Sequence, residues 1–61
     1  MRQITIAVGT MDNRWETVVV DSDMPDIDLM DENKLAELVV HNGWPIDKDI
    51  AFVHLYYVES Q

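Results

Sequence analysis

The chain opens with an alternation of large apolar and other positions. Residues 3–10 read Gln-Ile-Thr-Ile-Ala-Val-Gly-Thr and place Ile4, Ile6 and Val8 on one side. Period-two alternation with β-branched residues is typical of a strand with one buried face. Residues 11–13 read Met-Asp-Asn, and because Asp and Asn accept turn geometry, they predict a hairpin loop.

A second strand follows this loop. Residues 14–21 read Arg-Trp-Glu-Thr-Val-Val-Val-Asp, a run rich in β-branched and aromatic residues. One of its faces carries Val18 and Val20, and the other carries Trp15 and Val19 with a threonine between them. The pattern leaves the choice of the inward face open, and the bulk of Trp15 favours a place in the core.

Residues 31–42 carry a helical pattern. Leu35, Leu38 and Val39 recur at i, i+3 and i+4 and form an apolar stripe. Aspartates at the start suit an N-cap and the positive end of the helix dipole. Gly43 predicts a left-handed C-terminal stop, and the proline at position 45 blocks any continuation.

The last strand is predicted over residues 49–58, which read Asp-Ile-Ala-Phe-Val-His-Leu-Tyr-Tyr-Val. Both of its faces are largely apolar, so both need cover. With regular alternation, one face holds Ile50, Phe52, His54, Tyr56 and Val58, and the other holds Ala51, Val53, Leu55 and Tyr57.

A strongly acidic stretch separates the second strand from the helix. Residues 22–30 are predicted to be a linker, because Pro25 keeps the residue before it out of helical geometry. No Lys or Arg occurs between Arg14 and Lys34. Six carboxylates fall in and around this linker: Asp21, Asp23, Asp26, Asp28, Asp31 and Glu32.

Together these elements predict one small α+β domain over residues 1–61 in the order β-β-α-β. The hairpin makes the first two strands antiparallel, and the helix returns the chain so that the last strand lies antiparallel to the first. The expected fold is a three-stranded antiparallel sheet of order 2-1-3, with one helix packed on one face.

One helix leaves the second face of this sheet without cover, and two alternatives stay open. In the first, the linker folds back and covers that face with Met24, Ile27, Leu29 and Met30. In the second, the last strand, which lies at an edge, meets a partner or a second copy of the chain through Val53, Leu55 and Tyr56 or Tyr57.

The net negative charge of the chain limits the classes of function that it can have. The 61 residues include 12 Asp and Glu against 4 Lys and Arg, a formal charge of −8, and no Cys. This surplus argues against direct binding to nucleic acid or anionic membranes, which needs clustered cations. Without Cys, disulfides and thiolate zinc sites are excluded. No apolar run is long enough to span a membrane or resembles a signal peptide, so we expect a cytoplasmic protein.

The acidic stretch is the leading candidate for a binding surface. In an extended chain, carboxylates two residues apart, such as those of Asp26 and Asp28, lie on one side at about 6.6 Å. Such a row can occupy a nucleic-acid-binding groove in place of a phosphate backbone and speed association with a basic partner. The alternative is a solvated loop that keeps a small protein soluble.

Residues for catalysis or metal binding fall into no recognised spacing. A calcium loop would use Asp21, Asp23 and Glu32 as its first, third and twelfth residues. Proline stands at the fifth position of this loop, however, and aspartate stands at the sixth, where the sharp turn needs glycine. His41 and His54 lack metal-site spacing to other ligands. We therefore expect no enzyme, no cofactor and no metal.

The order of elements carries a resemblance. The stretch Asp31–Leu38 (Asp-Glu-Asn-Lys-Leu-Ala-Glu-Leu), then Trp44-Pro45 and a strand from Ile50 to Val58, is similar in style to small phage inhibitors of bacterial RNA polymerase. The size and acidity also resemble many anti-CRISPR and anti-restriction proteins. The resemblance covers most of the chain as an order of elements, implies a phage protein that disables host nucleic-acid machinery, and assigns no functional residue.

The sequence therefore predicts a non-enzymatic acidic protein-binding module, an inhibitor or regulator of a host protein with a basic, nucleic-acid-facing surface. The alternative is a structural or oligomerising module that forms a homodimer through its last strand. Trp44 would be an apolar anchor, since Trp is enriched at binding hot spots, or would close the core. The expected partner-binding residues are Asp21, Asp23, Asp26, Asp28, Asp31, Glu32, Trp44 and Tyr57.

Overall fold

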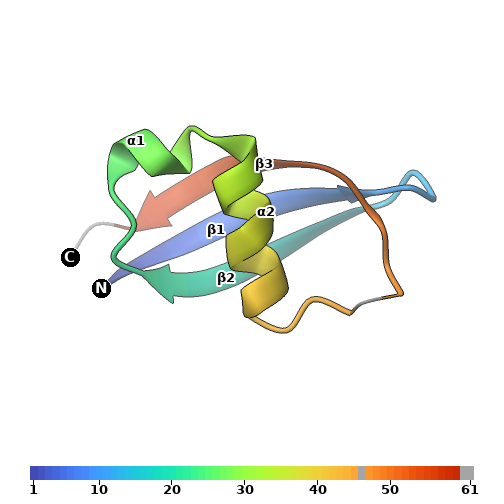
Figure 1. Cartoon of the computed structure of the whole chain (residues 1–61), viewed down its shortest axis with the longest axis horizontal. Coiled ribbons are helices and arrows are strands. Elements are labelled where there is room, and N and C mark those ends of the chain that lie inside the picture. Colours follow the sequence, from blue (N-terminus) through green and yellow to red (C-terminus); the bar gives the residue numbers. More distant parts are fainter. Residues whose placement is uncertain (46, 60–61) are drawn as a thin grey trace.

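The computed structural model describes residues 1–45 and 47–59. It confirms the α+β fold, with an antiparallel sheet of order β2-β1-β3 and one main helix (Figure 1). The three strands and the main helix begin and end within one residue of the predicted bounds. The elements are β1 (Arg2–Thr10), β2 (Trp15–Ser22), α1 (Asp26–Leu29), α2 (Glu32–His41) and β3 (Ile50–Glu59).

The β1–β2 connection is the predicted hairpin loop. The Thr10 amide donates to the Arg14 carbonyl at 2.9 Å, and the Asn13 amide donates to the Thr10 carbonyl at 3.1 Å. Asn13 has φ 68°, a left-handed conformation that Asn tolerates better than most residues. The turn fixes the register, in which Gly9 pairs with Trp15 and every later pair follows.

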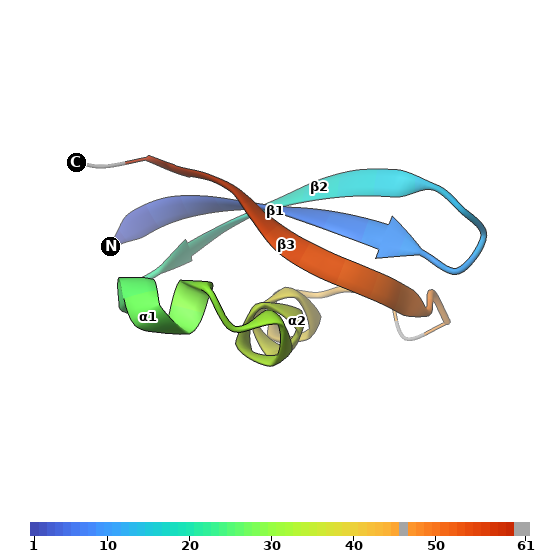
Figure 2. The ribbon, with the colours of Figure 1, turned by 90° about the horizontal axis from the view of Figure 1, so that it is seen from above.

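The core lies between one face of the sheet and the helices. Ile4, Ile6 and Val8 of β1 are fully buried, and they pack with Leu35 and Val39 of α2. Figure 2 shows α1 and α2 on the same side of the sheet. On β2 the inward face is that of Val18 and Val20, so Trp15 lies on the other side of the sheet from the helices.

Strand β3 does not alternate regularly, and its predicted faces are wrong. Thr5 pairs with Tyr57 and Ile6 pairs with Leu55, so Tyr56 is an extra residue that forms a bulge. Ala51 is a second extra residue near the start of the strand. An extra residue reverses the alternation beyond it, because each further residue points to the opposite face.

The two bulges sort the side chains of β3 differently from the expected pattern. Val53 is only 3% exposed and packs in the core beneath α2, with Ile50, Leu55 and Val58 on the same side. The expectation that Val53 and Leu55 meet a partner is therefore wrong. The side chains that face away from the helices are those of Phe52, His54, Tyr57 and Glu59, and Tyr56 is exposed beside them.

The predicted linker 22–30 is not a simple linker, because it contains the short helix α1. Leu29 of this helix is 2% exposed and packs into the core. Arg2 holds the segment in place: it donates to the Met24 carbonyl and pairs with Asp26 at 2.5 Å. Since α1 lies on the same side as α2, the linker does not cover the second face of the sheet (Figure 2).

Helix α2 has the predicted ends. The Asp31 carboxylate accepts a hydrogen bond from the Asn33 amide at 2.9 Å and caps the N-terminus. Gly43 follows the C-terminus with φ 98°, the left-handed conformation expected of it. Neither α1 nor α2, the helices of the described residues, has the length and apolar character that crossing a membrane requires.

Candidate protein-binding face

The sheet face opposite the helices, called here the open face, is made of four cross-strand rows. The β1 residue of each row sits between a β2 residue and a β3 residue, as the two registers require. From the hairpin end, the rows are Trp15–Gly9–Phe52, Thr17–Ala7–His54, Val19–Thr5–Tyr57 and Asp21–Gln3–Glu59.

An aromatic pair occupies the first row. The rings of Trp15 and Phe52 meet edge to face, with their centroids 4.5 Å apart, and the His54 ring lies 5.8 Å from Trp15. Gly9 makes this possible, because a Cβ there would lie 2.6 Å from the Phe52 ring. Trp15 nonetheless remains 56% exposed and Phe52 44% exposed, so the pair covers β1 without being covered itself.

Beyond this pair the open face forms a shallow trough. Small residues of β1, such as Ala7, make its floor, and side chains of the outer strands rise on both sides. A hollow of about 470 Å³ lies here, lined by Ala7, Trp15, Glu16, Thr17, His54 and Tyr56. Tyr56 and Tyr57 are 69% and 59% exposed. Contiguous exposed aromatic surface of this kind marks interaction sites on soluble proteins.

The rows of the open face include two carboxylates and no Lys or Arg. Asp21 and Glu59 flank Gln3 in the last row, and both are exposed. Two of the cations are held in ion pairs: Arg2 pairs with Asp26, and Lys48 pairs at 2.6 Å with Glu16, which lines the hollow.

The other predicted acidic residues lie in different local settings. Asp23 lies 3.5 Å from the N-terminal amine, and Asp31 is the cap of α2. Asp26 and Asp28 belong to α1, where residues two apart point to different sides. The expected extended row of carboxylates is therefore wrong for this pair. Glu32 lies exposed in the first turn of α2, on the helix side of the molecule.

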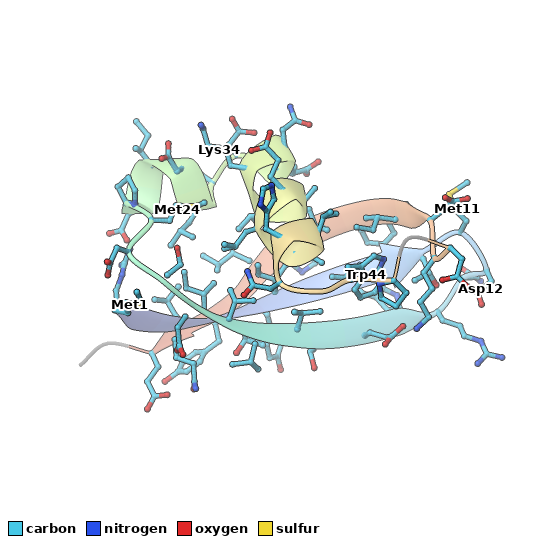
Figure 3. The ribbon with its side chains drawn as sticks, turned by 60° about the horizontal axis from the view of Figure 1, so that its bottom comes forward. Met1, Met11, Asp12, Met24, Lys34 and Trp44 are labelled. Carbon is cyan, nitrogen blue, oxygen red and sulfur yellow. The ribbon has the colours of Figure 1, made fainter. Side chains whose placement is uncertain are left out.

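The two predicted apolar anchors lie in different places. Tyr57 is exposed on the open face. Trp44 is half-buried, packs against the core, and donates from Nε1 to the Lys48 carbonyl at 2.8 Å. Figure 3 shows Trp44 between the end of α2 and the hairpin loop that carries Asp12. Trp44 therefore closes one end of the core, the other of its two expected roles.

The sequence favours Trp15 in the core, whereas the structure places it on the open face. A signal for the correct placement was present in the chain. Val18 and Val20 offer a purely aliphatic inward face for β2, and burying them forces Trp15 outward by period-two geometry. The opposing glycine in β1 marks the place where a large ring from a neighbouring strand can lie.

The hairpin end carries polar interactions of its own. The Thr10 hydroxyl donates to the Asp12 carboxylate and lowers the pKa of Asp12, and the nearby Arg14 guanidinium lowers it further. Within residues 1–45 and 47–59, no three metal-ligating side chains gather at one place.

Comparison with protein-family models, with curated proteins and with solved structures finds no match to this chain. A proposal for its function therefore rests on the chemistry of the open face. That face combines exposed aromatic rings with carboxylates on a three-stranded sheet.

Proposed function

We propose that the protein is a non-enzymatic module that binds a basic protein surface through its open face. One observation carries this proposal: the sheet face that no helix covers combines exposed aromatic rings with carboxylates and has no Lys or Arg in its rows. Trp and Tyr dominate protein interfaces because they bury large areas at little cost in side-chain entropy.

The charge of this face favours a protein partner over nucleic acid. Exposed aromatic rings on a sheet can also stack on unpaired bases, but such sites track the phosphates with a positively charged groove. Here the chain carries a formal charge of −8. Arg2 and Lys48, the cations with the shortest ion pairs, are each paired with a carboxylate, Arg2 with Asp26 and Lys48 with Glu16. A phosphate backbone would be repelled.

A basic protein surface fits the same features. Arg guanidinium groups stack on aromatic rings and pair with carboxylates, and a negative field speeds the encounter with a positive partner. A host protein whose basic surface otherwise holds nucleic acid is the partner class we propose. Occupation of that surface would make this protein an inhibitor or regulator.

A second candidate is the oligomerising module that pairs through β3. The sheet order places β3 at an edge, so one side of this ten-residue strand has no partner in the sheet. Two copies that each carry −8 repel one another, however, and this opposes the pairing at low salt.

The proposed function is tested by affinity capture from bacterial lysate at several salt concentrations, with nuclease present. The bait is compared with a Trp15→Ala/Tyr57→Ala variant, which removes two open-face rings, and with an Ile27→Ala/Met30→Ala control. The control removes two exposed apolar side chains of the α1 region, away from the open face. We expect a basic protein that binds the wild type and the control and is lost from the open-face variant.

Two results would overturn this function. One is a captured protein that the open-face variant retains as well as the wild type does. The other is recovery of a dimer of the bait alone, with sedimentation showing concentration-dependent association, which would favour pairing through β3. Variants that test pairing through β3 must change side chains outside the core. Val53 and Leu55 are unsuitable for this test, because they pack beneath α2.

A further inference from the structure

The sheet has two edge strands, and they differ in regularity. The order β2-β1-β3 leaves one side of β2 and one side of β3 without a neighbouring strand (Figure 1). Strand β3 contains the extra residues Ala51 and Tyr56, which break the even repeat of its backbone groups. Strand β2 pairs with β1 residue for residue from Trp15 to Ser22. Because bulges protect an edge strand from pairing with another chain, β3 has this protection and β2 lacks it.

The hydrogen bonds of the hairpin show which backbone groups of β2 point outward. The Thr10 amide donates to the Arg14 carbonyl at 2.9 Å, so these two residues form a hydrogen-bonded pair. Hydrogen-bonded and non-hydrogen-bonded pairs alternate along an antiparallel ladder. The pair Val8–Glu16 and every second pair beyond it are therefore hydrogen-bonded. The residues between them turn their N–H and C=O groups away from β1. These residues are Trp15, Thr17, Val19 and Asp21.

The outward groups of β2 form a ladder of donors and acceptors. Within residues 1–45 and 47–59, no backbone group outside β1 hydrogen-bonds to the backbone of Trp15–Asp21. The outward groups recur every second residue, which is about 6.6 Å along the strand. An extended chain presents N–H and C=O groups at the same repeat, whereas an α-helix uses its backbone groups within itself. The edge of β2 therefore selects a strand as its ligand.

Charge decides which strand fits this edge. A strand added beside β2 places every second side chain next to the open-face residues of β2, which begin with Trp15 and end with Asp21. Asp21 is exposed, and its row across the sheet continues with Gln3 and Glu59. A Lys or Arg next to Asp21 gains an ion pair, whereas an acidic side chain there is repelled. The formal charge of −8 opposes a second copy of this chain in the same way.

We propose that the outward edge of β2 binds an extended segment of a basic protein partner as a fourth strand of the sheet, with a Lys or Arg beside Asp21. This inference rests on the proposed function and adds the form in which the partner is recognised. The added strand lies beside Trp15 and Val19, so it continues the open face by one strand. Three consecutive valines, Val18–Val20, give β2 the β-branched side chains that favour strand pairing.

Amide hydrogen exchange measured by NMR tests the strand pairing. The probe is the acetylated and amidated peptide Lys-Thr-Val-Thr-Val-Thr-Lys, which reads the same in both directions and so places a Lys beside Asp21 in a parallel or an antiparallel arrangement. In the free protein the amides of Thr17, Val19 and Asp21 should exchange faster than those of Val18 and Val20, which donate to β1. Peptide at millimolar concentration should slow the three outward amides by at least about tenfold and leave the outward amides of β3 unchanged.

Two matched peptides separate the contribution of the backbone from that of the charge. One replaces both Lys residues by Glu. The other keeps the sequence but carries N-methyl groups on the central Thr and on the Val before it, which removes a donor from each edge of the peptide. NMR titration at low salt should show each of them binding at least about tenfold more weakly than the parent peptide.

A pair of protein variants assigns the binding to the edge of β2. Val19→Pro removes an outward N–H and leaves the hydrogen bonds to β1 in place, as proline does on an edge strand. It should weaken binding of the parent peptide at least about tenfold. The control Val19→Ala keeps the N–H and should bind within about threefold of the wild type. If circular dichroism shows that Val19→Pro has lost the fold, exchange of the wild-type amides decides.

Other outcomes overturn the inference. Unchanged exchange at Thr17, Val19 and Asp21, or equal affinity for the N-methylated peptide, would exclude strand addition at β2. Protection of these amides that rises with protein concentration alone would make a second copy the occupant. These failures are distinct from failure of the proposed function. A captured partner that still needs Trp15 and Tyr57 would then contact the open face without adding a strand.

Discussion

Gly9 shows how one residue sets the surface of this molecule. It lies in the middle strand, and the Phe52 ring rests where its Cβ would be, with 2.6 Å between that position and the nearest ring atoms. The ring then meets Trp15 edge to face across β1. Interior strand positions seldom favour Gly, because it loses much conformational entropy on folding. Contact with an aromatic ring gives this Gly a packing role.

A double-mutant cycle tests this role. In the wild-type background, Gly9→Ala should displace the Phe52 ring and lower the free energy of unfolding by about 0.5–1 kcal/mol, since an aromatic pair contributes about 0.5–1.5 kcal/mol beyond area burial. In a Phe52→Ala background the same change should stabilise by about 0.4–1 kcal/mol, because Ala restricts the unfolded chain. Urea unfolding of the four proteins measures both effects, and an equal cost in both backgrounds would contradict the packing role.

The two tryptophans show where residue-level prediction reaches its limit. The bulk of Trp15 favours a place in the core, and the sequence leaves the role of Trp44 open between an apolar anchor and a residue that closes the core. The structure exposes Trp15 and places Trp44 against the core, where its Nε1 donates to Lys48. The difference depends on which β2 face α2 covers and on a turn after the helix. The aliphatic pair Val18 and Val20 signals the first, whereas the second depends on contacts between distant segments, which no local pattern contains.

At the scale of elements, the predictable parts are those with local signals. The Asp31 cap, the Gly43 stop and the Asn13 turn each involve a residue whose own conformational preference decides the outcome. The bulges of β3 have no such signal, because Ala51 and Tyr56 are ordinary strand residues. Their effect is large, because after an extra residue each side chain of the strand points to the face opposite to the one that regular alternation predicts.

Neighbouring residues of β3 test the corrected faces. Val53→Lys places an ammonium group beneath α2 and should cost at least about 3 kcal/mol, a large part of the stability of so small a domain. His54→Lys, one residue further on the open face, should change the free energy of unfolding by less than about 0.5 kcal/mol. Thermal and urea unfolding followed by circular dichroism measures both variants. Similar losses for the two would show that β3 does not present these faces.

At the scale of the whole molecule, one charge imbalance acts on both folding and binding. Exposed ion pairs such as Arg2–Asp26 and Lys48–Glu16 hold segments together locally. Pairs of this kind contribute only about 0–1 kcal/mol each. The 12 acidic residues of the 61-residue chain, which has a formal charge of −8, repel one another and oppose this stabilisation. Repulsion should therefore dominate the electrostatic part of the stability.

Salt should consequently act in opposite directions on folding and on partner binding. Raising NaCl from about 10 to 200 mM shortens the Debye length from about 30 Å to below 10 Å, screens the repulsion and should stabilise the fold by about 1 kcal/mol, or roughly 4–8 °C in melting temperature. The variant Asp23→Asn/Glu32→Gln/Glu37→Gln carries fewer acids at exposed positions, so the same rise in salt should stabilise its fold less. Over the same range the captured basic partner should bind more weakly, because attraction between opposite charges is screened equally. A melting temperature that falls with salt would mean that the ion pairs outweigh the repulsion, and the acidic surplus would then need another physical account.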